Sequence, residues 1–373
     1  MTSDGTRAVH AGRAEVSPGG PFTAGPVFAS TYHLSGEPSG PFQYGRFANP
    51  TWVALERALG ELEDAAEVVT FASGMAAISA VLLGLTAPGD TVVLPSDGYP
   101  ATRTLGDHLA ARGATVRRAP TAADAQADVL AGANLLWLET PSNPGLDVCD
   151  IARLSELAHA EGALVAVDNT LATPLGQRPL ALGADLSVAS GTKALTGHSD
   201  ILLGYVACAD PAVADRVRAW RTLTGGVPGP MEAWLAHRSL ATLHLRLARQ
   251  AENAVAVARL LQSRAEVTGV RHPALPEDPA YPVAARQMRR HGCVVGFTLP
   301  DAATADRFLR ALRLVAEATS FGGTHSIAER RGRWPGDAVA PGFIRFSVGC
   351  EDPEDLLADV IQALDAALTD DAH

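Results

Sequence analysis

The sequence predicts an α/β protein built around a mostly parallel sheet. Between residues 67 and 208, short runs rich in apolar and β-branched residues alternate with amphipathic segments of helical period. Such strand–helix–strand repetition is typical of parallel sheets with right-handed crossovers. The runs are apolar throughout, which indicates strands that are covered on both faces. We therefore expect a ligand to bind beyond the carboxyl ends of these strands.

The chain of 373 residues is long enough for two domains and an arm. Residues 1–45 are rich in Gly, Pro and Ser and lack sustained periodicity, so we expect an extended N-terminal arm that wraps a neighbouring subunit. A large domain is expected over residues 46–245 and a smaller C-terminal α/β domain over residues 246–373. Glycines and prolines between residues 225 and 230 interrupt the pattern shortly before this boundary.

The large domain is expected to open with a helix at Pro50, for which Thr51 is the predicted N-cap. The clearest helix of this domain follows Asp150, another predicted N-cap, and ends at Gly162. The expected strands are residues 68–71, 91–95, 135–139, 164–168, 186–189 and 201–207.

The second region begins with a long expected helix. Pro353 follows Asp352, and proline at the first helical position predicts the start of the last helix there. The expected elements are a helix at 231–263, a strand at 293–299, a helix after Asp301, a loop at 320–323, a strand at 343–348 and the final helix.

Composition argues against several classes of partner. A net charge of −11 disfavours nucleic acid or an anionic membrane. The four cysteines form no CxxC pair, so we expect no metal site, no disulfide framework and a reducing cytoplasm. No run reaches the ~18 apolar residues of a membrane helix. Residues 1–12 also lack the apolar segment of a signal peptide.

Lys193 is the only lysine in the sequence. A lysine amine of lowered pKa can form a Schiff base, and arginine cannot replace it in that chemistry. Asp168 ends the buried run at 164–168, where a carboxylate is costly unless it is paired. A protonated pyridine nitrogen is one possible partner for Asp168, and a helix cap or turn is the alternative.

Other residues near these strand ends suit the same kind of ligand. Ser73, Gly74 and Met75 lie between a strand and a helix, so their backbone N–H groups could bind a phosphate, although an ordinary helix start explains them equally well. Ser190 and Thr192 add hydroxyl groups beside Lys193.

Two further side chains could contact a flat ring and a substrate. Tyr99 could stack on the ring, or it could be an ordinary surface tyrosine. Arg345 could bind a carboxylate through its planar fork, or it could form a structural salt bridge.

Seven motifs follow one another along almost the whole chain. They are TRAVHAG at 6–12, YGR at 44–46 with NPT at 49–51, FASGM at 71–75, ETPSNP at 139–144, VDNT at 167–170, SGTK at 190–193 with GH at 197–198, and IRFSVG at 344–349. Together they resemble the Cys/Met-metabolism branch of the pyridoxal-phosphate (PLP) enzymes. The resemblance implies an aspartate-aminotransferase-like fold of type I, with a seven-stranded sheet in the large domain.

The resemblance also implies roles for individual residues. Lys193 would be the Schiff-base lysine, Asp168 the partner of the pyridine nitrogen, and Tyr99 the ring-stacking tyrosine that assists proton transfer. Phosphate contacts are implied for Gly74, Met75, Ser190 and Thr192, and, from a neighbouring subunit, for Tyr44 and Arg46. Substrate-carboxylate contacts are implied for Asn143, Arg345 and the backbone of Ser320. A homodimer would then be the minimal unit, and a tetramer is usual for the branch.

The implied function is that of a carbon–sulfur lyase similar to cystathionine γ-lyase, which converts cystathionine to cysteine, 2-oxobutanoate and ammonia. One alternative is γ-replacement on an activated homoserine, as in cystathionine γ-synthase. A methionine γ-lyase is another, although Ala101 stands where those enzymes place cysteine. A PLP aminotransferase and a non-catalytic protein with this fold are further alternatives.

The sequence departs from the family pattern where substrate choice should be made. His325 stands where many members carry glutamate in a Gly-Gly-x-Glu-Ser segment. Arg330, Arg331, Arg333 and Trp334 then replace a segment of the His-Pro and Thr-His type. We interpret this arginine cluster first as a solvated basic loop. The alternative hypothesis is that it attracts the distal carboxylate of cystathionine, which Arg330→Ala and Arg333→Ala would test.

Overall fold

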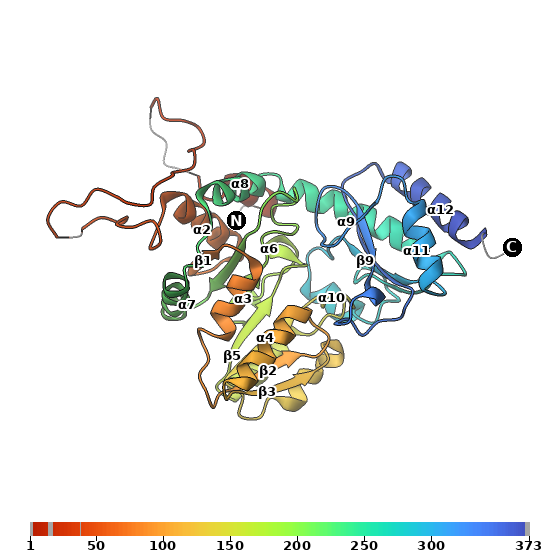
Figure 1. Ribbon diagram of the computed structural model, residues 1–373, viewed down its shortest axis with the longest axis horizontal. Helices are drawn as coiled ribbons and strands as arrows, with labels where there is room; N and C mark the ends of the chain where they lie inside the picture. The colour runs from red at the N-terminus through yellow and green to blue at the C-terminus, as the bar shows by residue number, and fades with distance from the viewer. Residues whose placement is uncertain (1–2, 14–17, 38, 370–373) are drawn as a thin grey trace.

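The computed structural model describes residues 3–13, 18–37 and 39–369 and contains two sheets (Figure 1). The larger is seven-stranded, in the order β1-β7-β6-β5-β4-β2-β3. β7 runs antiparallel to both of its neighbours, β1 and β6, and the other neighbouring strands are parallel, so the predicted mostly parallel α/β fold is confirmed. The strands are β1 (Glu67–Phe71), β2 (Thr91–Pro95), β3 (Thr115–Ala119), β4 (Leu135–Glu139), β5 (Leu164–Asp168), β6 (Leu186–Ala189) and β7 (Gly204–Cys208).

Two strand predictions for this sheet were wrong in part. The strand expected from residue 201 begins at Gly204, because Leu203 exchanges hydrogen bonds with Thr192 in the turn around Lys193 rather than with a neighbouring strand. β3 was missed because it lies at the sheet edge, and the partly exposed Arg117 and the exposed Arg118 interrupt its apolar pattern. The other expected strands agree with the structure to within one residue.

Helices cover both faces of the seven-stranded sheet, as its apolar strands require. One face packs against α3 (Gly74–Leu82), α4 (Pro100–Ala111) and α7 (Pro211–Thr224). The other packs against α2 (Pro50–Glu63) and α5 (Ile151–Ala160). Shorter turns are η1 (Ala122–Val129), α6 (Thr173–Gly176) and η2 (Leu180–Leu182).

Of the N-caps predicted for α5 and α2, the first is confirmed and the second is wrong. Asp150 accepts the backbone N–H of Arg153 at 3.1 Å and caps α5, as predicted. Thr51 was the wrong residue for the cap of α2, because Asn49 accepts the backbone N–H of Thr51 at 2.8 Å and Thr51 lies inside the helix.

The long helix predicted at 231–263 is two helices, α8 (Pro230–Leu240) and α9 (Leu243–Gln262). The chain turns between them because the Ser239 carbonyl accepts the Thr242 backbone N–H at 3.2 Å and the Arg246 guanidinium at 3.0 Å. The predicted domain boundary at residue 245 falls inside α9, and the division into domains stays a prediction.

The second sheet has five strands in the order β10-β11-β12-β9-β8. Its apolar face packs against α9, α11 and α12 in one core. The elements are β8 (Thr268–Arg271), α10 (Tyr281–Gln287), β9 (Val294–Thr298), α11 (Ala302–Ala311), β10 (Ala316–Glu317), β11 (Ile327–Arg330), η3 (Arg331–Arg333), β12 (Phe343–Ser347) and α12 (Pro353–Thr369). No helix in the described part of the chain is long and apolar enough to cross a membrane.

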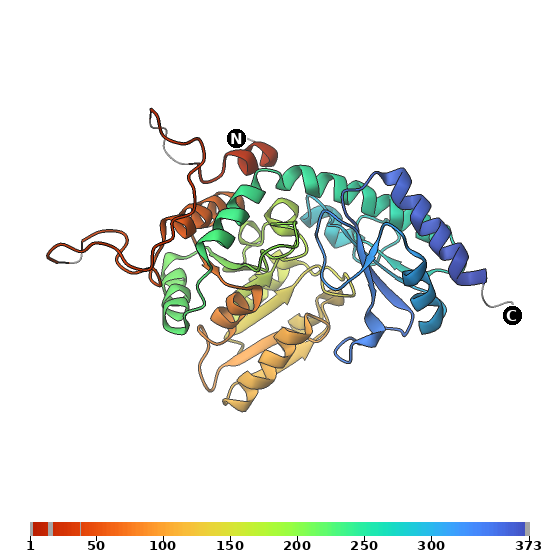
Figure 2. The same cartoon turned by 45° about the horizontal axis from the view of Figure 1, so that its top comes forward.

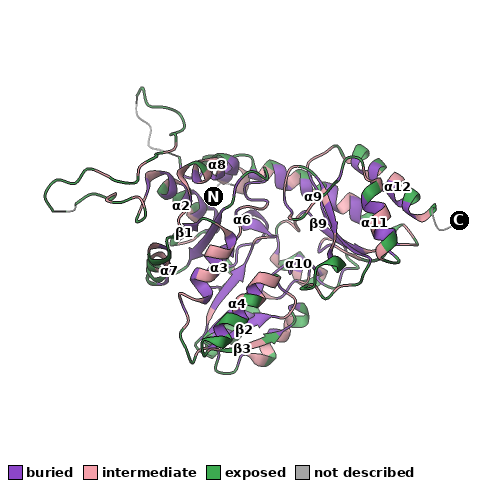
Figure 3. Ribbon diagram, viewed as in Figure 1, coloured by how far each residue is buried: buried purple, intermediate pink, exposed green. Residues whose placement is uncertain are grey.

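The N-terminal segment is only partly the extended arm that was expected. Residues 4–10 form α1 (Asp4–His10), which packs on the body through the buried Ala8, with Asp4 paired to Arg178 at 2.5 Å. The chain that follows projects in two loops away from the sheets (Figures 1 and 2), and it is largely exposed (Figure 3). Residues 1–2, 14–17 and 38 of the predicted arm, and 370–373 of the predicted C-terminal domain, lie outside the described residues.

Candidate active site

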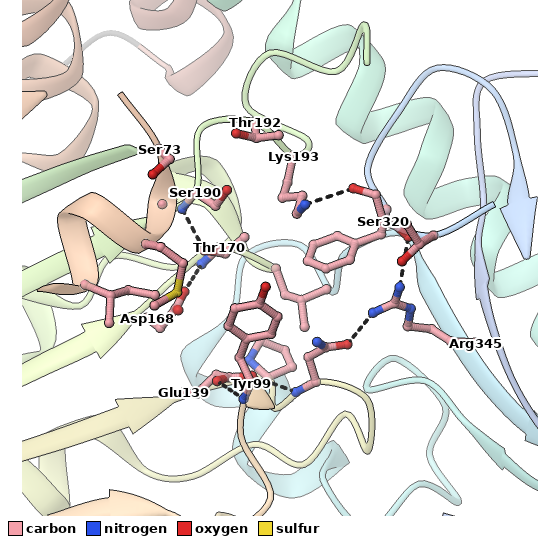
Figure 4. Close-up of a pocket in the computed structure, with 18 of the residues that line it drawn as sticks. Ser73, Tyr99, Glu139, Asp168, Thr170, Ser190, Thr192, Lys193, Ser320 and Arg345 are labelled. Atoms are coloured by element: carbon pink, nitrogen blue, oxygen red, sulfur yellow. Dashed lines mark hydrogen bonds between the residues drawn. The ribbon is translucent and has the colours of Figure 1, made fainter. Parts of the chain in front are cut away.

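A cavity of about 330 Å³ lies between the two sheets, at the carboxyl ends of β4, β5 and β6 (Figure 4). Two walls face each other across it. The large-sheet wall comprises the start of α3, the strand ends and the turn around Lys193, and the small-sheet wall comprises residues 319–321, Arg331 and Arg345. The predicted residues Gly74, Met75, Tyr99, Asn143, Asp168, Ser190, Thr192, Lys193, Ser320 and Arg345 all line this one cavity.

The start of α3 forms one end of the cavity. Ser73 caps the helix by accepting the backbone N–H of Ala76 at 3.1 Å, and Gly74 is its first residue. A Cβ atom at position 74 would come within 2.7 Å of the Cβ of Ser190, so glycine is needed for the close approach of the two segments. Free N–H groups at a helix N-terminus beside hydroxyl groups suit a phosphate.

Asp168 ends β5 and is buried on the cavity wall. Its Oδ1 accepts the backbone N–H of Thr170 at 3.0 Å. Burial raises the pKa of Asp168, and the Thr170 hydrogen bonds and nearby Lys193 offset only part of this effect. A carboxylate in this setting is stabilised by a cationic ligand.

Lys193 reaches across the cavity, and its Nζ lies 2.9 Å from the Oγ of Ser320 on the opposite wall (Figure 4). Burial and the charge of Arg345 lower the pKa of Lys193, although Asp168 opposes them. A lowered pKa increases the fraction of neutral, nucleophilic amine. Ser320 has φ +90°, a strained value for a residue other than glycine, as is common at functional sites.

Arg345 lies on β12 and is only 4% exposed. It donates to the Asn143 Oδ1 at 2.6 Å, to the Ser320 carbonyl at 3.1 Å, and to the Glu329 carboxylate. Burial and the neighbouring Arg331 lower the pKa of Arg345 to about 10, so it stays charged at neutral pH. Its predicted neighbours Asn143 and Ser320 are therefore in direct contact with it.

Glu139 was not singled out as a site residue, although it lines the cavity. It ends β4 beside Asp168, and its carboxylate accepts the backbone N–H groups of Tyr99 and Asn143. The signal that could have identified it is its place as first residue of the motif at 139–144.

Two predicted cofactor contacts, Tyr44 and Arg46, are not brought to the cavity of this chain. Tyr44 is 41% exposed and pairs with Thr31 at the base of a projecting loop. Arg46 donates to the carbonyl of Thr222 at 2.5 Å. Their expected contact with a neighbouring subunit stays a prediction.

Of the three arginines in the cluster, the structure brings one to the cavity. Arg330 pairs with Asp306 at 2.7 Å and Arg333 with Glu317 at 2.7 Å, and neither lines the cavity. Arg331 lines it instead. The 3₁₀ turn η3 places these neighbouring side chains in different directions, which composition could not predict. His325 is exposed and does not line the cavity.

The residues of the cavity fit PLP. The cradle at Gly74 suits its phosphate, the buried Asp168 suits its pyridine nitrogen, and the Lys193 amine suits its aldehyde. In the described ranges, His, Cys, Asp and Glu side chains do not gather into a group that could hold a metal ion.

Comparison with known proteins agrees with this chemistry. The family "Cys/Met metabolism PLP-dependent enzyme" matches residues 5–365. "Putative cystathionine gamma-lyase" of Streptomyces coelicolor is 64% identical, covering 97% of this chain and 93% of that protein. "Cystathionine gamma-synthase" of Mycobacterium bovis is 37% identical, covering 98% and 97%.

A solved structure shows the same fold. The crystal structure of cystathionine gamma synthase from Xanthomonas oryzae pv. oryzae in complex with cystathionine superposes with a TM-score of 0.95 at 35% identity, covering 99% of both chains. The expected type of fold is thereby confirmed. This chain belongs to the family of Cys/Met metabolism PLP-dependent enzymes.

Proposed function

We propose that this enzyme is a carbon–sulfur lyase that cleaves cystathionine, with one water, to cysteine, 2-oxobutanoate and ammonia. The observation that carries the proposal is the meeting of Lys193, Asp168 and the Arg345–Asn143 pair around a single cavity. The 64% identity to a protein named as a cystathionine gamma-lyase supports this reading over the synthase reading, whose named relative is 37% identical.

PLP, when bound, supplies an aldehyde for the substrate amine and a ring that withdraws electrons from the substrate Cα. Lys193 and Asp168 would hold it at the aldehyde and the ring nitrogen, and Tyr99 would stack on the ring. The start of α3 with Ser190 and Thr192 would hold the phosphate. We also propose that Tyr44 and Arg46 of a second subunit contact that phosphate, because neither residue lines the cavity of its own chain.

The substrate carboxylate would bind Arg345, with Asn143 and the Ser320 backbone fixing the guanidinium. This contact would hold the Cα–H bond near the amine of Lys193, which would take the Cα proton. Tyr99 would assist by giving a proton to the leaving sulfur. The Ser320 hydroxyl, 2.9 Å from Nζ, fixes the position of the lysine.

The alternative is γ-replacement on an activated homoserine, which the 37% identity to a cystathionine gamma-synthase supports. Both reactions use the same residues, so product analysis must separate them. Purified enzyme with PLP should release cysteine and 2-oxobutanoate from cystathionine. Formation of cystathionine from an O-acylhomoserine and cysteine, without 2-oxobutanoate from cystathionine, would instead establish the synthase.

We further propose a cytoplasmic homo-oligomer with a dimer as its smallest active unit and a tetramer as its full assembly. The projecting N-terminal segment supports this, since Phe22 is 88% exposed and Phe28 69% exposed, and aromatic side chains on an arm are suited to burial against a partner. The four cysteines are free, which suits a reducing compartment.

A further inference from the structure

Glu139 connects two parts of the cavity and has no role in the function proposed above. It is 4% exposed, and its two carboxylate oxygens point to two different loops. Oε2 accepts the backbone N–H of Tyr99 at 2.6 Å, and Oε1 accepts the backbone N–H of Asn143 at 2.9 Å (Figure 4). One side chain therefore fixes the backbone of both the predicted stacking residue and the predicted carboxylate-binding residue.

The connection continues to the small-sheet wall. The Asn143 side chain accepts a hydrogen bond from Arg345 at 2.6 Å. A continuous series of contacts thus runs from Tyr99 through Glu139 and Asn143 to Arg345. A shift of the loop on either side of Glu139 would move the ring contact and the carboxylate contact relative to each other.

The absence of a side chain at Gly98 makes space for the carboxylate of Glu139 beside the backbone of Tyr99. A Cβ atom at position 98 would lie 2.8 Å from Oε2 of Glu139 and 2.7 Å from Cγ of Pro95. Any other residue at position 98 would displace the carboxylate or the loop. Glycine is thus required next to Tyr99 for steric reasons.

A carboxylate is a costly residue at this place. Burial and the charge of Asp168 on the adjacent strand raise the pKa of Glu139, whereas its two backbone hydrogen bonds act in the opposite direction. Only a carboxylate offers an acceptor oxygen to each of two N–H groups, because a glutamine amide has one acceptor oxygen and one donor nitrogen. The double acceptor is therefore the property that glutamate provides here.

We propose that Glu139 is a positioning residue that holds the Tyr99 ring in register with the Asn143–Arg345 pair. The inference depends on the proposed function for the roles of these three residues. It does not depend on which sulfur amino acid is the substrate.

The test uses Glu139→Gln and Gly98→Ala, with Glu63→Gln as the control. Glu63 is a fully buried carboxylate of the same domain outside the cavity. Each apoenzyme is titrated with PLP for its Kd. The visible circular dichroism of the loaded protein then reports how the bound ring is oriented, and kcat and KM for cystathionine are measured at saturating PLP. Far-UV circular dichroism of each apoenzyme verifies folding.

Glu139→Gln should raise the Kd for PLP about tenfold, the effect of one lost charge-assisted hydrogen bond. Glu139→Gln should also change the visible circular dichroism of the bound cofactor. Gly98→Ala should change that spectrum in the same direction as Glu139→Gln does, because it displaces the same carboxylate. Both should raise KM and lower kcat, and the control should match the wild type in all of these.

The inference is overturned if the folded Glu139→Gln protein keeps the wild-type Kd and visible spectrum; if that protein does not fold, Gly98→Ala decides by the same criteria. If the wild type fails to cleave cystathionine but the Kd and spectrum of the variants change, the proposed substrate is wrong and the inference stands. If the wild type cleaves cystathionine and neither readout changes, the inference alone is wrong.

Discussion

The two walls of the cavity differ in whether their charged side chains have ion-pair partners. On the large-sheet wall, the described residues place no ion-pair partner within 4.0 Å of Lys193 or Asp168. Their side chains form hydrogen bonds with the neutral residues Ser320 and Thr170. On the small-sheet wall, Arg345 and Arg331 share the buried Glu329, and Arg331 also pairs with Asp337 at 2.5 Å.

This difference indicates what each wall does. Buried charges without partners are unfavourable until a ligand of opposite charge or a covalent bond completes them, so the large-sheet wall is suited to react and to bind tightly. Burial raises the pKa of Glu329, but Arg345, Trp334 and Arg331 outweigh it and keep the pKa below its ordinary value. The small-sheet wall is thus electrically balanced and is suited to orient a substrate.

The largest effect is expected at Lys193. Lys193→Ala should lower kcat by at least about a thousandfold, since general acid–base catalysis alone contributes on the order of 10²–10⁴. Lys193→Arg is the matched control for charge, and it should be equally inactive because a guanidinium cannot form the covalent link. Borohydride reduction followed by mass spectrometry should locate the cofactor on this residue in the wild type. Activity of Lys193→Arg above a tenth of wild type would refute the assignment.

The next effect is expected on the balanced wall. Arg345→Lys should raise KM for cystathionine about a hundredfold, because breaking a buried charge pair costs on the order of 2–5 kcal/mol. The matched control is Arg221→Lys, since Arg221 is equally buried and pairs with Glu56 at 2.6 Å outside the cavity. That control should lower thermal stability and leave KM unchanged. If Arg345→Lys and Arg221→Lys had the same KM as the wild type, Arg345 would not bind the substrate.

A smaller effect should reveal which arginine faces the outer part of the substrate. Arg331→Leu should lower kcat/KM for cystathionine about tenfold, the size of one charged hydrogen bond. For methionine the loss should be less than about threefold, because the thioether of this substrate carries no distal carboxylate. Arg330→Leu is the matched control, since Arg330 pairs with Asp306 outside the cavity. An equal loss for both substrates would mean that Arg331 only supports the wall.

No effect on activity is expected at Glu63, a carboxylate that is buried outside the cavity, and its effect is on stability alone. Burial raises the pKa of Glu63 to about 7, and hydrogen bonds from Tyr205 and Ser187 offset only part of this. Since the folded pKa lies above the unfolded one, the wild type should lose stability as pH rises from about 4.5 through about 7.

Glu63→Gln removes this titration. Above pH 7 it should be more stable than the wild type by at most about 3 kcal/mol, and below pH 4 the difference should vanish. Chemical denaturation at pH 4, 6 and 8 measures it. A wild-type stability independent of pH over this range would contradict the raised pKa of Glu63. Glu63 could then no longer serve as the buried carboxylate outside the cavity with which the carboxylates of the cavity are compared.

Much of the large-sheet wall could be predicted because its residues follow strand ends. Lys193 was identified as the only lysine, and Asp168 as the polar end of an apolar run. The start of α3 was predicted from small residues between a strand and a helix. Each of these signals comes from residues that are neighbours in the chain.

Other features were missed because they depend on partners distant in sequence. The bond from Glu139 to Tyr99 joins residues 40 positions apart, and the bond from Arg345 to Asn143 joins residues 202 apart. Arg330, Arg331 and Arg333 are the same residue type, so the sequence does not distinguish them. The start of the turn η3 and the pairs of Arg331 with Glu329 and Asp337 direct Arg331 to the cavity.

The α/β fold, most of its strands and Lys193 as the candidate reactive amine could be predicted from the residues alone, because apolar period, helix caps and residue type act locally. The tertiary structure decided which carboxylates pair with which arginines and which polar groups meet across the cavity. Those choices depend on packing between two sheets, where the low dielectric makes each unpaired charge costly and so selects one arrangement.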